Sequence, residues 1–166
     1  RNNDLNRSKY MAENIGNILE NEGKGVKIVL SAHNGHITTF YKQRETGYWL
    51  KQKYGSRYYA LGYEFNQGKT LGFDIIDDEL IFSDLKIGPS KNGTLGFLLS
   101  TSVGQDCFID FAGKEIPEWF SQKHLCSDIL GCYGQKGCNQ RYTNIILTES
   151  YDGIIYIDET HAANRM

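Results

Sequence analysis

The amino-acid sequence predicts an α/β fold with a mainly parallel sheet flanked by helices. Segments with helical spacing alternate with apolar or Tyr-rich runs along the 166 residues, as is typical of layered α/β domains. The run VKIVLSA, residues 26–32, is rich in β-branched residues and predicts a strand covered on both faces. The chain has no internal repeat and no Pro- or Ser-rich linker, so we expect residues 1–166 to belong to a single domain.

The first predicted element is a helix over residues 9–21. Met11, Ile15, Ile18 and Leu19 recur at positions i, i+4, i+7 and i+8, which places them on one face of a helix. Gly23 comes just after this pattern and favours the end of the helix. The apolar run then supplies the first expected strand.

The rest of the chain continues the alternation. Segments that predict helices place apolar residues at helical spacing, and segments that predict strands are short runs rich in Tyr, Ile and Phe. They are, in order, a helix over 47–55, a strand over 57–65 with a turn at 66–68, a hairpin or extended excursion over 73–87, a helix over 93–102, a strand over 106–111, a helix over 116–125 and a last strand over 151–160. Crossovers between parallel strands should be right-handed.

Composition narrows the range of partners. The net charge of −2 gives no general attraction to nucleic acid. The apolar runs are far shorter than the ~20 residues of a membrane span. We therefore expect no nucleic-acid and no membrane partner, and a cytoplasmic protein. The chain opens at Arg1 and runs directly into a helical pattern, so we also expect an N-terminal part to precede it.

Four cysteines are present, Cys107, Cys126, Cys132 and Cys138. Their spacing does not match a paired CxxC zinc site. An even number permits disulfides without demanding them, so free thiols, disulfides and a metal site all stay open. No cofactor is predicted.

Two of the four histidines, His33 and His36, follow the predicted strand 26–32 directly. Ligands of parallel α/β sheets bind beyond the carboxyl ends of the strands. Between the histidines, Asn34 and Gly35 favour a tight turn, with Gly35 free to take a positive φ. Imidazole exchanges protons near neutral pH, so the pair is a candidate catalytic site.

Two other interpretations of the pair remain. The histidines fit a surface loop without catalytic function. A His-x-x-His pair also chelates zinc when a third ligand joins it, and Glu13, Asp74 or His161 would be the candidates. The helical HExxH form is absent, because Asn34 stands where that motif has glutamate.

Two motifs carry a resemblance to a known family. The stretch RSKYMAEN fits a helix of the pattern Arg-Asp-x-x-Met-Ala-x-Asn through Arg7, Met11, Ala12 and Asn14. The stretch AHNGH fits the pattern Ala-His-Asn-x-His through Ala32, His33, Asn34 and His36. The later segments GYWLKQKYGSRYYALGYEFNQG and YDGIIYIDET match in order and spacing. In these features the chain resembles the erythromycin esterase family, although Ser8 stands where the family usually has Asp.

The resemblance implies a hydrolase of esters or macrolactones, linked to macrolide resistance, in which histidine activates water without a serine nucleophile. It implies that this chain is the C-terminal portion of a single domain, incomplete without an N-terminal portion that supplies a further histidine and a glutamate. That histidine is the favoured general base. We therefore expect the chain alone to be inactive, and an exposed sheet edge to allow self-association.

The resemblance also implies roles for individual residues. His33 and His36 would be catalytic, orienting the water or stabilising the oxyanion. The remaining candidates would bind or orient substrate or catalytic groups: Arg7, Glu13, Asn14 and Asn34. A small-ligand binding module, an incompetent fragment and a metal-dependent hydrolase using His33 and His36 are the alternatives.

Overall fold

The computed structural model describes residues 2–40, 42–111, 115–127 and 142–163. The chain divides into two compact units. Unit 1 comprises Arg1–Gly62, Asp110–Ile116 and Leu147–Gly153, and unit 2 comprises Tyr63–Ile109, Pro117–Ile146 and Ile154–Met166. Among the described residues, no helix is long and apolar enough to cross a membrane.

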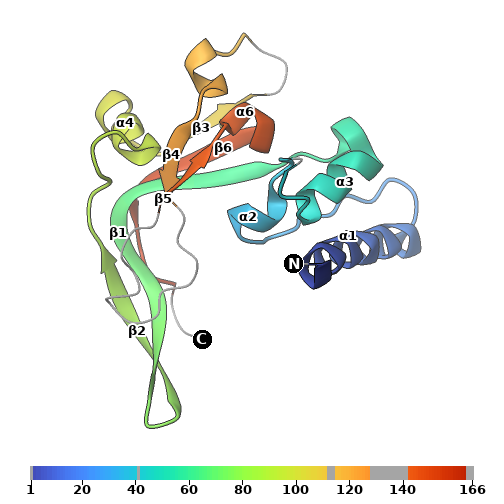
Figure 1. Cartoon of the computed structure of the whole chain (residues 1–166), viewed down its shortest axis with the longest axis horizontal. Helices are drawn as coiled ribbons and strands as arrows, with labels where there is room; N and C mark the ends of the chain where they lie inside the picture. Colours follow the sequence, from blue (N-terminus) through green and yellow to red (C-terminus); the bar gives the residue numbers. More distant parts are fainter. Residues whose placement is uncertain (1, 41, 112–114, 128–141, 164–166) are drawn as a thin grey trace. The chain divides into compact units, whose positions relative to one another are not determined.

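Unit 1 is mainly helical and unit 2 holds most of the strands (Figure 1). The elements of unit 1 are α1 (Asn2–Glu22), α2 (Asn34–Ile37), α3 (Thr46–Tyr54), the 3-10 helix η1 (Gly55–Arg57) and α6 (Leu147–Ser150). The elements lying wholly or mostly in unit 2 are β1 (Leu61–Ile76), β2 (Glu79–Ile87), α4 (Leu95–Ser102), β3 (Cys107–Asp110), the 3-10 helix η2 (Glu118–Ser121), β4 (His124–Ser127), β5 (Tyr142–Ile145) and β6 (Gly153–Thr160).

In unit 1, α1 packs on α3 through a stripe of small residues. Ser8, Ala12 and Gly16 recur at every fourth position of α1 and are buried. A Cβ atom on Gly16 would run into the side chain of Lys53 of α3. The predicted helix is therefore confirmed, but its buried face is the small-residue stripe. Ile18, on the apolar face that predicted the helix, is 52% exposed.

The α/β class is confirmed, and the main sheet is mixed, with the strand order β2-β1-β6-β3. Strands β1 and β2 are antiparallel, from the pair Gly68 and Ile87 to the pair Ile76 and Glu79. Strands β1 and β6 run in parallel, because position 66 lies beside 158 and positions 67 and 69 lie beside 160. Strand β3 is antiparallel to β6, because position 106 lies beside 158 and position 111 beside 152. A second sheet pairs β4 with β5, also antiparallel.

Each unit has its own buried residues. In unit 1 the buried hydrophobic residues are Ala12, Ile37, Leu50, Ala60, Phe111, Leu147 and Tyr151. In unit 2 they are Leu85, Ile87, Leu95, Leu99, Phe120, Cys126, Ile154 and Tyr156. In β6, Ile154 and Tyr156 are buried and Ile155 between them is half-buried, which places Ile154 and Tyr156 on one face, as expected for a strand.

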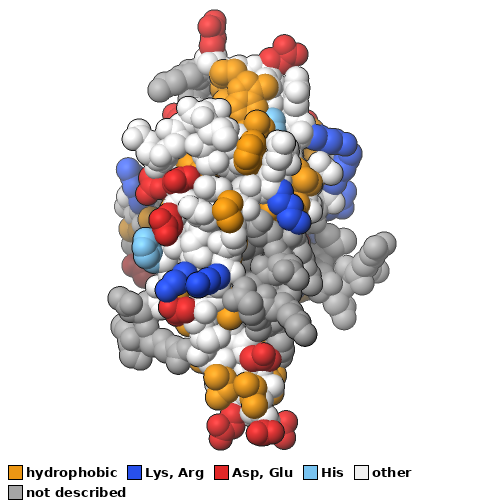
Figure 2. Space-filling model, turned by 90° about the vertical axis from the view of Figure 1, so that its left-hand side faces the viewer, with side chains coloured by type: hydrophobic (Ala, Val, Ile, Leu, Met, Phe, Trp, Pro, Cys, Tyr) orange, Lys and Arg blue, Asp and Glu red, His pale blue; other side chains and the backbone are white. Residues whose placement is uncertain are grey.

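The hairpin prediction over 73–87 is confirmed. Asp77 and Asp78 form the two-residue turn between β1 and β2, and both have positive φ, of 51° and 63°. Two consecutive left-handed residues are the signature of a type I′ turn, which matches the twist of a hairpin. Hydrophobic and acidic side chains lie together at the tip of this hairpin (Figure 2, bottom).

Three predicted elements were wrong. Residues 26–32 form no strand, and Val29 is 96% exposed, because no strand of the described residues pairs with this run. The predicted turn at 66–68 lies inside β1. Gly68 has φ 128°, and a Cβ there would overlap the backbone of Thr160, so this glycine allows close strand contact and does not end the strand. The helix expected over 116–125 is only the short η2.

Candidate functional site

The two histidines of the AHNGH motif lie on one helical turn, α2. His33 is its N-cap residue, with φ −61° and ψ 147°, and its backbone oxygen accepts a hydrogen bond of 2.8 Å from the His36 amide. Its ring Nδ1 accepts a second one, of 3.2 Å, from the Gly35 amide. Gly35 does not take the positive φ that we expected, because the segment is a turn of helix. His33 is exposed, and the His36 side chain is 38% exposed, so solvent reaches both rings.

Glu45 connects His36 to α1. The Nδ1 atom of His36 lies 3.4 Å from Oε2 of Glu45. The same oxygen accepts a hydrogen bond of 2.7 Å from the hydroxyl of Ser8, which is buried on α1. Ser8, His36 and Glu45 therefore form one chain of contacts across three segments of unit 1.

The end of α2 is held by contacts with α3 and with Tyr58, which follows η1. A Cβ atom on Gly47, in the first turn of α3, would overlap the backbone of Ile37. The hydroxyl of Tyr58 donates to the Ile37 carbonyl at 2.8 Å. Burial, with a smaller effect from Asp152, raises the pKa of Tyr58 to about 12, so this phenol stays a neutral donor at ordinary pH.

The segment after α2 is tied to the α6 turn. The backbone amide of Thr39 donates to the Ser150 carbonyl at 2.9 Å, and its hydroxyl donates to the Glu149 carbonyl at 3.0 Å. The carbonyl of Asn34 lies 3.5 Å from the hydroxyl of Tyr151. The backbone that carries the two imidazoles is thus fixed from both sides within unit 1.

Three of the other predicted site residues lie on α1. Arg7 and Asn14 are exposed. Glu13 is exposed too and lies 3.9 Å from Lys9 in an ion pair one turn apart. The structure gives no direct test of the substrate or orienting roles of these residues or of Asn34, which stay predictions.

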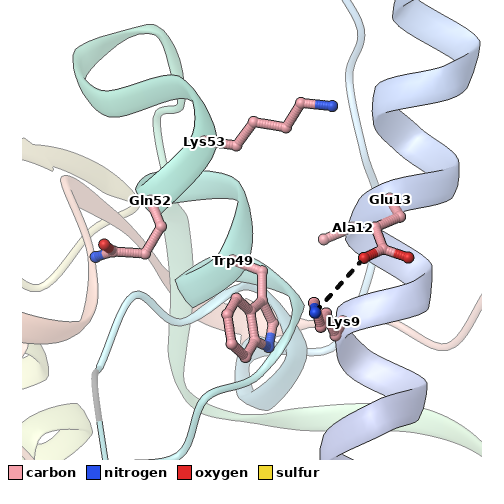
Figure 3. A pocket seen from close by; sticks show the side chains of 6 residues that line it. All are labelled: Lys9, Ala12, Glu13, Trp49, Gln52 and Lys53. Carbon is pink, nitrogen blue, oxygen red and sulfur yellow. Dashed lines mark ion pairs between the residues drawn. The ribbon is translucent and has the colours of Figure 1, made fainter.

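A pocket of about 290 Å³ lies between α1 and α3 (Figure 3). The residues lining it are Lys9, Ala12, Glu13, Trp49, Gln52 and Lys53. Of the predicted site residues, only Glu13 reaches it. The two histidines belong to a different part of unit 1.

The metal hypothesis gains no support from the geometry. Within the part of the chain that the structure describes, no three His, Cys, Asp or Glu side chains lie close enough to hold a metal ion. Cys107 and Cys126 are free thiols, whereas Cys132 and Cys138 lie outside the described residues. Burial raises the pKa of the Cys126 thiol, which makes it a poor nucleophile.

A comparison with known families decides the assignment. Residues 1–160 match the family described as erythromycin esterase. The chain belongs to the erythromycin esterase family. No curated protein matches it.

Solved structures share the fold of this chain. The mutant EreC erythromycin esterase in its open conformation has a TM-score of 0.62 and 15% identity, covering 92% of this chain and 36% of its own. A succinoglycan biosynthesis protein has a TM-score of 0.59 and 19% identity, covering 79% and 32%. A Bacillus cereus protein has a TM-score of 0.56 and 19% identity, covering 76% and 32%. The chain therefore spans about a third of the length of each.

The two motifs come from different segments of unit 1. Met11 of the first motif contacts α3, where the Thr46 hydroxyl lies 3.9 Å from its sulfur.

Sequence analysis missed Glu45, which lies in a loop nine positions after His36. No spacing rule connects two such positions, so only the folded loop could reveal the contact.

Proposed function

We propose that this member of the erythromycin esterase family works in a hydrolase whose histidines assist the attack of water on an ester or macrolactone carbonyl. The observation that carries the proposal is the arrangement of α2. It presents two solvent-accessible imidazoles, His33 and His36, on one turn whose backbone is fixed by surrounding segments. Membership of the erythromycin esterase family supports the reaction class.

In this mechanism, water adds to the carbonyl carbon and the carbonyl oxygen becomes an oxyanion. Collapse of the tetrahedral intermediate breaks the old C–O bond, and the departing oxygen takes up a proton to give an alcohol and a carboxylic acid. Imidazoles orient the water and stabilise the oxyanion. We propose that Arg7, Glu13, Asn14 and Asn34 bind substrate or orient the catalytic groups.

The chain supplies one part of the site. Because it spans about a third of the solved relatives, we propose that other residues of the full-length protein complete the site and supply the general base. The isolated chain should then show little hydrolysis, since one wall of a site lacks the preorganised geometry of catalysis.

The test is a hydrolysis assay of the full-length protein with a macrolactone antibiotic and with aryl esters. Mass spectrometry should show the gain of one water by the macrolactone. His33→Asn and His36→Asn should each lower turnover by about 10²-fold or more, as expected for loss of acid–base assistance.

His161→Asn is the matched control, because His161 is an exposed histidine of unit 2. It should hydrolyse at the wild-type rate. Unchanged turnover in both folded α2 variants would refute their role. Loss of turnover in His161→Asn, restored by added zinc, would instead favour the metal-dependent hydrolase.

A further inference from the structure

We infer that, within the proposed hydrolytic site, the neutral rings of His33 and His36 carry their proton on opposite nitrogen atoms, and that Glu45 is a positioning residue that sets the group presented by His36. The His33 ring carries its proton on Nε2. His36 presents a ring nitrogen lone pair. The two roles follow from the group that each Nδ1 atom faces.

The partner of His33 Nδ1 is a backbone amide. The Gly35 N–H can only donate, so Nδ1 of His33 holds a lone pair at their 3.2 Å contact. A neutral imidazole carries one proton, which therefore sits on Nε2.

The partner of His36 Nδ1 is a carboxylate. Ionised glutamate only accepts hydrogen bonds, so Nδ1 of His36 carries the proton in their 3.4 Å contact. In the neutral ring this leaves a lone pair on Nε2, which suits the orientation of a water molecule. Ser8 strengthens the arrangement, because its hydroxyl donates to the same Oε2 at 2.7 Å and fixes the carboxylate.

The Glu45 side chain does not serve to cap the start of α3. Glu45 is the N-cap residue of α3, yet its side chain makes no capping hydrogen bond. Ser, Thr, Asp and Asn are the residues that favour this position. The carboxylate instead turns toward Ser8 and His36, so removing it should cost α3 little of its own capping.

The experiment reads the ring tautomers directly. The full-length protein is labelled with ¹⁵N-histidine, and long-range ¹H–¹⁵N correlations are recorded at alkaline pH, where free imidazole is neutral. The spectra of His33→Asn and His36→Asn assign the signals. The wild type should show the proton of His33 on Nε2 and that of His36 on Nδ1.

The decisive variant is Glu45→Ala. It should move the His36 proton toward Nε2 and leave the His33 tautomer unchanged, whereas the control Glu79→Ala on the β1–β2 hairpin should change neither. If Glu45→Ala does not fold, the isosteric Glu45→Gln takes its place and should lower the Nδ1–H fraction. The assignment would be overturned if wild-type His36 carried its proton on Nε2. It would also be overturned if the His36 tautomer were the same in Glu45→Ala and Glu45→Gln as in the wild type.

The tautomers are measured without substrate, so this result is independent of the hydrolysis assay. With an ester that the wild type cleaves, Glu45→Ala should lower kcat by about 10- to 100-fold, because part of the acid–base contribution depends on ring orientation. KM should change little. The expected tautomer shift without any hydrolysis by the wild type would uphold the positioning of His36 and count against the proposed function alone.

Discussion

Lys51 Nζ lies 2.7 Å from Oδ1 of Asp152, and this ion pair joins α3 to the residue that precedes β6. Oδ2 of Asp152 accepts a hydrogen bond of 2.8 Å from the Ala60 amide. Lys51 also donates to the Tyr58 carbonyl at 3.2 Å. Both carboxylate oxygens are therefore used, and three separate segments of unit 1 meet at one group.

The first prediction concerns this group. Asp152→Ala should lower the free energy of unfolding by about 1–3 kcal/mol, because it leaves the Lys51 ammonium and the Ala60 amide without their partner. The two side chains are only 32% and 21% exposed, so water replaces the lost contacts poorly. Urea denaturation measures the change.

Its control is Glu20→Ala, which removes the exposed pair with Lys53. This pair is well screened by water, so the variant should unfold close to the wild-type midpoint. Equal effects of the two variants would show that the Asp152 group adds nothing beyond a surface ion pair.

The second prediction concerns substitutions of Ser8, one of which, Ser8→Asp, places another carboxylate beside Glu45. Ser8 is 4% exposed, and its hydroxyl donates to Glu45. Ser8→Ala should cost about 1 kcal/mol for one hydrogen bond, and Ser8→Asp should cost more, since two carboxylates would meet away from water. Thermal unfolding compares the variants. The double variant Ser8→Asp with Glu45→Ala should recover part of the loss, and strict additivity would contradict the repulsion.

The third prediction tests the contact between α2 and α3. Gly47→Ala should lower the free energy of unfolding by about 1–3 kcal/mol, because the added Cβ meets the backbone of Ile37. Gly35→Ala is the matched control, since a Cβ there lies at an ordinary 3.5 Å from His33 Nδ1. It should be neutral or stabilising by up to about 1 kcal/mol, through helix propensity. A Gly47→Ala variant as stable as Gly35→Ala would disprove the close approach.

The fourth prediction is a pH dependence from Glu64 in unit 2. Burial raises the pKa of Glu64 from 4.5 to about 7, although the Ser127 amide donates to the carboxylate at 3.0 Å. Between these two values the folded state keeps a proton that the unfolded state releases. The free energy of unfolding should therefore fall as pH rises from about 4.5 to 7 and then level off, with a loss of at most about 3 kcal/mol.

Glu64→Gln keeps the shape of the protonated side chain and isolates this effect. Its stability relative to the wild type should grow between pH 5 and 8, as measured by urea unfolding at both values. Glu79→Gln, in an exposed part of the hairpin, is the control. A constant difference between Glu64→Gln and the wild type across this range would rule out the titration.

The parts of the fold that sequence could predict are those set by local chemistry. Helical spacing predicted α1 and α3, and α3 ends at its C-cap Gly55, which has φ 57°. The strand prediction for residues 26–32 was wrong because β-branched composition gives only a preference for the strand conformation. A strand also needs a neighbouring strand to pair with. The turn predicted at residues 66–68 was wrong because glycine favours a turn locally, whereas Gly68 makes room for β6.

The candidate site was predictable only where the motif itself carries the chemistry. His33 and His36 stand three positions apart, so any helical turn brings them to one place. Glu45 and Ser8 reach His36 through tertiary packing of α1 against the loop before α3. Glu45 is not unusual in its local sequence, and Ser8 stood out only as a departure from the family pattern. No local signal therefore connected either residue to His36.

The β1–β2 turn has a practical consequence. Asp77 and Asp78 occupy left-handed conformations that Asn and Gly adopt more readily, and the flanking Ile75 and Ile76 are more than half exposed. A fluorophore or short affinity tag inserted at this tip would touch no buried side chain. The hairpin is thus a natural attachment point for immobilising the protein or for following its conformation by energy transfer.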